Sequence, residues 1–200
     1  NYIVVMPDAD VPKTVDALST AAFGCAGERC MAGSTAITVG PAADRLLPTL
    51  VDAARAIKVG PTDRPTPQPD MGPVVTAQHR DRVLSLVASG EKEGARILCD
   101  GRGVKVADAP KGFYLGATIV DQVRHDMTLA REEIFGPVLN VMRMDDLDHA
   151  IEQANQSAFG NGAAIFTNSG KAAREFKHRV KAGMVGINVG VPATMAMFPF

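Results

Sequence analysis

The stretch YIVVMPDADVPKTVDALSTAAFG (residues 2–24) contains the pattern that the rest of the chain repeats. Residues 2–6 form a short apolar run, which predicts a buried strand that Pro7 ends. Asp8 or Asp10 can cap the helix that follows. The apolar residues of this helix recur at helical spacing, at Val11, Val15, Leu18 and Ala22. A buried strand followed by an amphipathic helix is the repeating unit of an α/β protein.

The same alternation continues to the end of the chain. Further strands are expected at residues 34–40, 95–101, 112–120, 137–144, 162–167 and 184–188. Amphipathic helices are expected at residues 46–57, around residues 83–87, and at residues 145–157 and 169–183, with Gly183 as the last cap. The pattern predicts the α/β class, with an open, twisted, mostly parallel sheet flanked by helices.

One segment interrupts this alternation. GPTDRPTPQPDMGP, residues 60–73, holds five prolines and must be irregular because proline fixes φ and removes a backbone donor. It is either a linker between two domains or a long surface loop. The segments on its two sides have similar composition and similar element types, which favours the loop. Residues 1–200 are therefore expected to form a single domain.

Composition excludes several classes of protein. Apolar residues make up 46%, charged residues 22%, and the net charge is −1, as in ordinary soluble globular proteins. There is no basic excess that would indicate nucleic-acid binding, and no apolar run approaches the roughly 18 residues of a membrane span. Three cysteines do not make a disulfide framework, which favours a reducing compartment. The histidines have no metal-ligand spacing, so no metal site is predicted.

The segment AGERCMAGS, residues 26–34, raises a chemical question about Cys30. Most free cysteines are small buried hydrophobes without a chemical role, and Cys25 and Cys99 are read that way. Three features favour a nucleophile at Cys30. Arg29 supplies positive charge, glycines on both sides let the backbone bend around a bound group, and a helix beginning at or after Met31 would direct N–H groups at a thiolate or oxyanion.

A second segment, LAREEIFGPVLNV (residues 129–141), places two acids before an aromatic residue. In one interpretation Glu132 and Glu133 are a solvated pair at a turn and Phe135 packs in the core. In the other, a carboxylate and an aromatic ring are held together at a turn beside a site, where the carboxylate accepts the two hydroxyls of a ribose.

Taken together, GERCMAGS and EEIFGPV resemble the aldehyde dehydrogenase superfamily. The segments GFYLGATIV, ANQSAFGNGAAIFT and AGMVGINVG are similar to segments of that family in the same order, so the resemblance spans nearly the whole chain. The RCM tripeptide, the opening N…VVMPDA and the ending GINVGVP…MF are most similar to the methylmalonate-semialdehyde dehydrogenases, the branch that transfers its acyl group to coenzyme A.

The resemblance implies roles for individual residues. Cys30 matches the nucleophile, and its N–H contributes to the oxyanion hole. Glu133 matches the glutamate that holds the nicotinamide ribose of NAD, and Phe135 matches the aromatic residue beside the nicotinamide. Arg29 is expected to pair with the substrate carboxylate. The branch has Gln at the position of Glu28, where a carboxylate disfavours a thiolate unless it points away.

The resemblance also implies a reaction and a setting. The expected activity is NAD-dependent oxidation of malonate or methylmalonate semialdehyde through a cysteine thioester, with coenzyme A as acyl acceptor. The alternatives are a non-acylating aldehyde dehydrogenase, which gives the free acid, and a non-catalytic or redox-sensing cysteine domain. The chain is expected to be the catalytic domain without the family's nucleotide-binding domain, and inactive as a dehydrogenase by itself. The whole protein is expected to be a homo-oligomer in a bacterial cytoplasm or the mitochondrial matrix.

Overall fold

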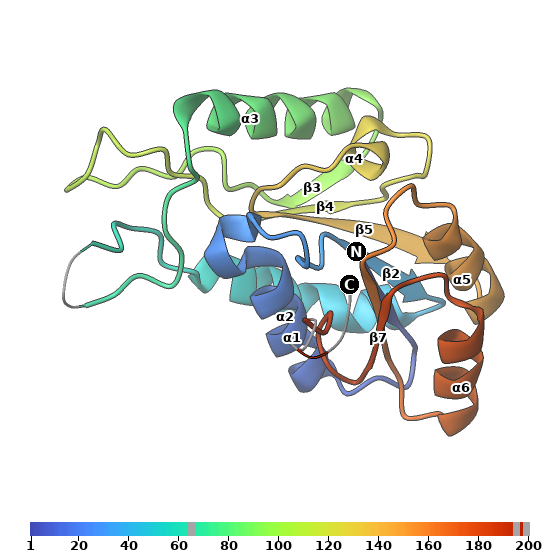
Figure 1. Ribbon diagram of the computed structural model, residues 1–200. Helices are drawn as coiled ribbons and strands as arrows, with labels where there is room; N and C mark the ends of the chain where they lie inside the picture. Colours follow the sequence, from blue (N-terminus) through green and yellow to red (C-terminus); the bar gives the residue numbers. More distant parts are fainter. Residues whose placement is uncertain (64–66, 194–196, 198–200) are drawn as a thin grey trace.

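A single seven-stranded sheet forms the centre of the computed structural model, which describes residues 1–63, 67–193 and 197 (Figure 1). Its strands are β1 (Tyr2–Val5), β2 (Thr35–Val39), β3 (Arg96–Cys99), β4 (Thr118–Asp121), β5 (Val138–Met144), β6 (Gly162–Phe166) and β7 (Met184–Ile187). Their order is β3-β4-β5-β2-β1-β6-β7. Only β3 runs antiparallel to its neighbour. The predicted open, mostly parallel α/β sheet is confirmed.

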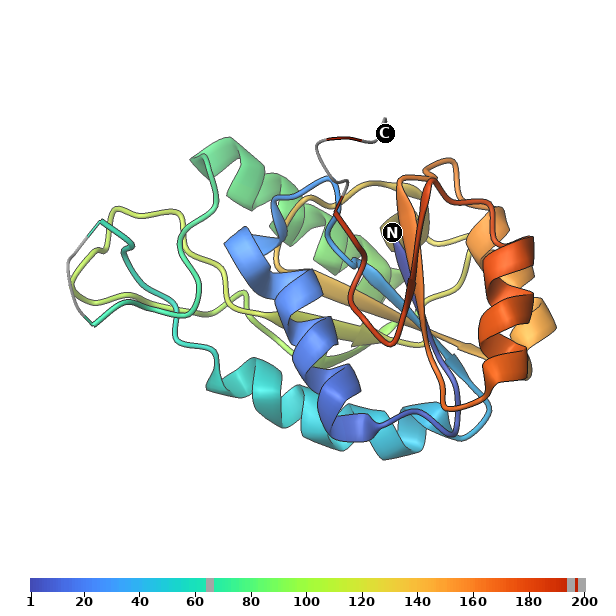
Figure 2. The same cartoon turned by 60° about the horizontal axis from the view of Figure 1, so that its bottom comes forward.

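Helices cover both faces of this sheet. They are α1 (Val11–Phe23), α2 (Ala42–Ala56), α3 (Ala77–Lys92), α4 (Thr128–Arg131), α5 (Leu147–Asn155) and α6 (Gly170–Arg179). Helices α1 and α2 lie together on one side, and α3 lies on the other (Figures 1 and 2). The chain winds from β1 to β2 in one direction and from β5 through β6 to β7 in the other. Parallel crossovers are right-handed, so the side on which a connecting helix lies depends on the direction of the crossover along the sheet. Helix α1, which connects β1 to β2, therefore lies on the face opposite to α5 and α6, which connect β5 to β6 and β6 to β7.

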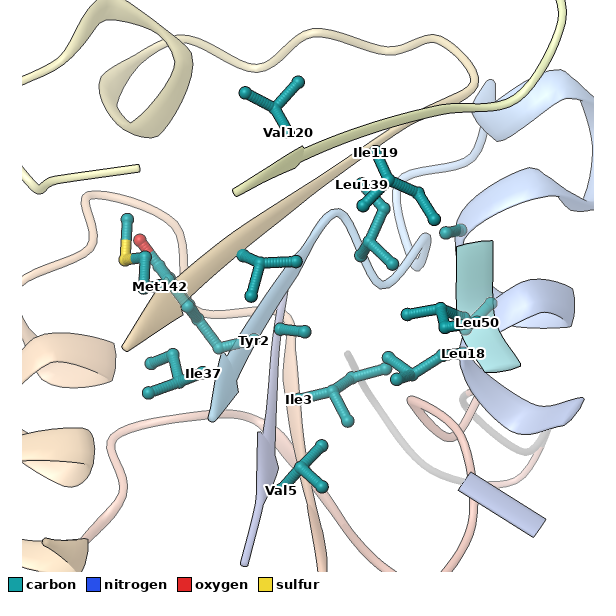
Figure 3. Packing of buried hydrophobic residues seen from close by; sticks show 14 of the residues in the cluster. Tyr2, Ile3, Val5, Leu18, Ile37, Leu50, Ile119, Val120, Leu139 and Met142 are labelled. Atoms are coloured by element: carbon teal, nitrogen blue, oxygen red, sulfur yellow. The ribbon is translucent and has the colours of Figure 1, made fainter. Parts of the chain in front are cut away.

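The core follows the period of two along each strand. Ile3 of β1 points toward Leu18 of α1 and Leu50 of α2 (Figure 3), and all three side chains are fully buried. Ile37 and Met142 fill the space on the opposite face of the sheet. The central strands are buried on both faces, as expected for parallel strands between two helical layers.

Among the described residues, four of the six helices begin directly after a residue whose side chain caps the first turn. Asp10 caps α1 by accepting the Lys13 N–H at 3.1 Å, and Asp8 instead accepts the hydroxyl of Thr167 at 2.8 Å. The prediction that the last helix reaches Gly183 is wrong. Helix α6 ends at Arg179, and the Asn155 side chain donates a hydrogen bond to the carbonyl of this last residue.

The strand expected at residues 112–120 is also shorter than predicted, because β4 begins only at Thr118. Before it, the chain crosses residues 100–103, where the Gly116 N–H donates to the Gly101 carbonyl at 2.8 Å. A Cβ on Gly101 would lie 2.0 Å from the Gly116 oxygen. Two glycines are needed for this close backbone crossing, which replaces regular pairing.

The proline-rich segment connects α2 to α3 without regular structure in its described residues, apart from one bridge between Val59 and Met71. Residues 64–66 lie outside the described part. Strands from both sides of the segment, β2 before it and β3 after it, belong to the same sheet. Among the described residues, no helix is long and apolar enough to cross a membrane.

Candidate active site

One cleft contains all four residues singled out from the sequence: Cys30, Arg29, Glu133 and Phe135. It opens at the amino ends of β1, β2 and β5, where it is also lined by Tyr2, Thr35, Val138 and Asn140. Ligands of open parallel sheets usually bind at the carboxyl ends of the strands. The Cys30 and Phe135 motifs each directly precede a strand, β2 and β5, so their positions in the chain place them at this amino edge.

The chain before Cys30 makes an unusual turn. Cys25, Ala26 and Gly27 all have left-handed backbone angles, with φ of 52°, 54° and 71°. This turn, η1 (Gly24–Gly27), ends α1 and leaves Cys30 exposed at the cleft. Such angles are costly for residues with a Cβ, so the conformation must be held by its surroundings.

No helix begins at or directly after Met31, so the condition for helical N–H groups directed at Cys30 is not met. Residues 30 and 31 form a turn, and the next element is β2, which begins at Thr35. No helix dipole therefore points at Cys30 from this segment. Within the described residues, no acceptor takes the Cys30 N–H, so this donor remains free for an oxyanion.

Two asparagines that the sequence analysis did not identify hold the Cys30 backbone. The Asn1 side chain donates to the carbonyls of Cys30 and Ala32, each at 2.8 Å, and accepts the Gly162 N–H at 2.9 Å. Asn161 donates to the same Cys30 carbonyl at 3.3 Å. No sequence signal marks these residues, because their contacts join segments between 29 and 161 residues apart.

Arg29 is partly used by the end of α1. Its Nη2 donates to the Thr20 carbonyl at 2.7 Å and to the Ala21 carbonyl at 2.9 Å, the orphan acceptors of a helix C-terminus. Its Nε is buried and has no hydrogen-bond partner in the described part of the chain. The guanidinium thus caps α1 with one nitrogen and retains unused donor capacity beside the cleft.

The Glu133 and Phe135 side chains lie on the loop between α4 and β5. Glu133 is exposed, and its carboxylate makes no hydrogen bond or ion pair with other described residues. Phe135 is 38% exposed and adopts φ of 56°. A free carboxylate and an accessible ring fit a ribose and a flat aromatic group.

The Cys30 and Phe135 segments touch through two glycines. A Cβ on Gly27 would lie 2.1 Å from the Gly136 carbonyl oxygen. The backbones of the two motifs therefore pack directly on each other.

The remaining cysteines differ in their surroundings. Cys25 is exposed, whereas Cys99 is buried and donates to the Ala117 carbonyl at 3.3 Å. Burial raises the pKa of the Cys99 thiol, which makes it a poor nucleophile. No group of three His, Cys, Asp or Glu residues in the described part of the chain is arranged to hold a metal ion.

Comparison with known proteins matches this chain to one family. The model of the aldehyde dehydrogenase family matches residues 1–200. The chain is 50% identical over 200 residues to malonate-semialdehyde dehydrogenase 1 of Oceanobacillus iheyensis, covering 100% of this chain and 40% of that protein. It is 49% identical to the mitochondrial acylating methylmalonate-semialdehyde/malonate-semialdehyde dehydrogenase of Bos taurus, covering 100% of this chain and 37% of that protein.

Solved structures agree with these sequence matches. The methylmalonate-semialdehyde dehydrogenase of Oceanimonas doudoroffii superimposes with a TM-score of 0.94 at 45% identity, over 98% of this chain and 40% of that one. A 1-pyrroline-5-carboxylate dehydrogenase from Thermus with bound NAD gives a TM-score of 0.89 at 27% identity, over 97% and 36%. The chain spans about 40% of the length of the curated relatives it matches. Over all of its 200 residues, the chain belongs to the aldehyde dehydrogenase family.

Proposed function

We propose that the protein carrying this chain oxidises malonate or methylmalonate semialdehyde with NAD and transfers the acyl group to coenzyme A. The observation that carries the proposal is the exposed Cys30 in one cleft with Arg29, Glu133 and Phe135. The names of the relatives, which are malonate- and methylmalonate-semialdehyde dehydrogenases, support this substrate class.

In the proposed mechanism, the Cys30 thiolate attacks the aldehyde carbon and forms a carbon–sulfur bond. The carbonyl electrons move to oxygen, and the free Cys30 N–H stabilises the resulting oxyanion. When the oxyanion collapses and the hydride leaves this carbon, a thioester remains on Cys30. The thiolate of coenzyme A then takes the acyl group, and the Cys30 sulfur departs as the leaving group.

The residues present fit NAD at this cleft. The Glu133 carboxylate, which has no partner among the described residues, would hold the ribose hydroxyls, and the exposed Phe135 ring would lie beside the nicotinamide. NAD, when bound, supplies the acceptor for the hydride. The left-handed backbone at Phe135 presents the ring to the cleft in a fixed orientation.

Arg29 is proposed to select a substrate that carries a carboxylate. Its Nη2 is used by α1 and its Nε is buried, so Nη1 is the nitrogen left to bind an anion. A guanidinium is always charged, and its hydrogen bonds to a carboxylate are strong.

We further propose that residues 1–200 form one domain of a homo-oligomeric protein, located in a bacterial cytoplasm or the mitochondrial matrix. The single sheet supports one domain. Matches to bacterial relatives and to a mitochondrial one support the two locations.

The test uses a protein that contains these 200 residues and is as long as the relatives. It measures the formation of NADH and of acyl-coenzyme A from malonate semialdehyde. We expect Cys30→Ser to reduce turnover to less than about a thousandth and Cys25→Ser to leave it unchanged. NADH and free acid without any need for coenzyme A would instead identify the non-acylating enzyme. No turnover with any semialdehyde would favour the alternative of a non-catalytic or redox-sensing cysteine domain. A reversible Cys25–Cys30 disulfide under mild oxidant would support that alternative.

A further inference from the structure

The Glu28 side chain turns toward α3 rather than toward Cys30. Its Oε1 accepts the Val75 N–H at 3.1 Å and lies 3.5 Å from Nε2 of His79. Only 15% of the Glu28 side chain and 17% of the His79 side chain are exposed. The acid beside the proposed nucleophile is therefore held at the start of α3.

His79 connects this acid to the Phe135 loop. It is the third residue of α3, and the Thr76 hydroxyl caps its N–H at 3.1 Å. Its Nε2 lies 2.6 Å from the Phe135 carbonyl oxygen. Since a carbonyl oxygen only accepts, Nε2 carries the hydrogen and donates it. The two rings also meet edge to face, with centroids 6.2 Å apart.

Arg82 lies one turn further along α3 and supports the same loop. Its Nη1 donates to the carbonyls of Glu133 at 3.0 Å and Ile134 at 3.1 Å. Three consecutive carbonyls, those of residues 133–135, are therefore held from one helix. A bulky residue at positive φ, as at Phe135, persists only where such contacts over-determine it.

We propose that Glu28 and His79 are a positioning pair that fixes the Phe135 loop relative to Cys30. Glu28 follows the left-handed turn of the Cys30 segment, and His79 holds the loop that presents Glu133 and Phe135. Neither residue lines the cleft, so the pair acts through the backbone of the two segments. The proposal rests on the proposed function, in which that loop binds NAD.

The test uses paired variants that remove or keep each contact. His79→Leu removes the donor to Phe135, whereas His79→Gln retains an amide that can donate. Glu28→Ala removes the acceptor for Val75, whereas Glu28→Gln retains it. His149→Leu is the matched control, because His149 is also the third residue of a helix and its N–H is capped in the same way, by Asp146.

Two measurements follow the loop. The first is amide hydrogen exchange of residues 134–138 in the 200-residue chain without NAD. The second is the KM for NAD and the KM for the aldehyde, both measured in a protein that contains these 200 residues and is as long as the relatives. We expect His79→Leu and Glu28→Ala to raise exchange and the KM for NAD about 3- to 10-fold, with the aldehyde KM unchanged. Both glutamine variants and His149→Leu should remain within about twofold.

The double variant Glu28→Ala with His79→Leu tests whether the two residues act together. A combined effect smaller than the product of the single effects supports the pair, and a full product overturns it. Exchange that is the same in His79→Leu as in His149→Leu also overturns it. If no form of the protein makes NADH but exchange still responds, the proposed function fails while the positioning of the loop stands.

Discussion

At the scale of single residues, Arg29 serves two purposes with one guanidinium. It caps α1 through Nη2, and it is proposed to bind the substrate carboxylate with Nη1. We expect Arg29→Leu to raise the KM for malonate semialdehyde about 10- to 100-fold, because hydrogen bonds to charged groups are lost. The KM for propanal, which has no carboxylate, should change far less. Steady-state kinetics with both aldehydes measures this, and equal increases would assign Arg29 to the fold instead.

Gly27 is the residue on which the packing of the two motifs depends. It has φ of 71°, and a Cβ there would lie 2.1 Å from the Gly136 carbonyl oxygen. We expect Gly27→Ala to lower the free energy of unfolding by at least about 2 kcal/mol, from backbone strain and this collision. Urea unfolding of the 200-residue chain measures the loss.

Gly103→Ala is the control for that measurement, because, apart from its chain neighbours, no atom of the described residues lies within 4 Å of a Cβ at Gly103. Its unfolding free energy should stay within about 0.5 kcal/mol of the original chain. Similar values for the two alanine variants would show that the Gly27–Gly136 contact does not constrain the fold.

Some residues of the candidate site could be predicted from the sequence, and others could not. Cys30, Glu133, Phe135 and Arg29 stand in local motifs, and motifs are what a single sequence displays. Asn1, Asn161 and His79 act on those motifs from distant segments, and nothing in their own neighbourhoods marks them. The direction of Glu28 was equally hidden, since only the position of α3 determines where its carboxylate finds partners.

At the scale of elements, Asn155 joins the ends of two helices. Its side chain donates to the Arg179 carbonyl at 2.9 Å and accepts the Lys181 N–H at 2.7 Å, so the last residue of α5 terminates α6. We expect Asn155→Ala to cost about 1 to 2 kcal/mol of unfolding free energy, because both backbone groups lose their partner.

The control for Asn155 is its neighbour Gln156, which is exposed and whose side chain makes no hydrogen bond with other described residues. Gln156→Ala should change the unfolding free energy by less than about 0.5 kcal/mol. If Asn155→Ala changes the free energy of unfolding in urea as little as Gln156→Ala does, water replaces both hydrogen bonds of Asn155. In that case α6 ends for another reason.

Element types were predictable because apolar spacing reports burial directly, whereas element ends depend on tertiary partners. The expected end of α6 at Gly183 failed because Asn155 supplies the cap earlier. The expected strand at residues 112–120 was too long because Gly101 and Gly116 cross there. Asp10 and Asp146, in contrast, cap their own helices, and local capping of this kind is visible in a sequence.

At the scale of the whole molecule, the sheet provides the site through its amino edge. Strands β1, β2 and β5 start side by side there, and the Cys30 turn and the Phe135 loop enter the sheet at the same edge. The class of fold follows from the alternation of elements along the chain. The edge follows from the order of the motifs, because the Cys30 turn and the Phe135 loop each directly precede a parallel strand, β2 and β5.

This arrangement predicts that the 200 residues unfold as one unit, although a proline-rich segment divides them. The sheet interleaves the two halves, since β5 from the second half pairs with β2 from the first. We expect urea to release the amides of β1 and β2 and those of β4 and β5 from hydrogen-exchange protection at the same concentration. Cys99 gives an independent readout, because burial raises its thiol pKa and shields it from iodoacetamide. Its alkylation at pH 8 should rise in the same transition, since only unfolding returns the thiol to its ordinary pKa. Two separate transitions, with the first half opening before Cys99 reacts, would mean that the proline-rich segment is a linker between independent domains.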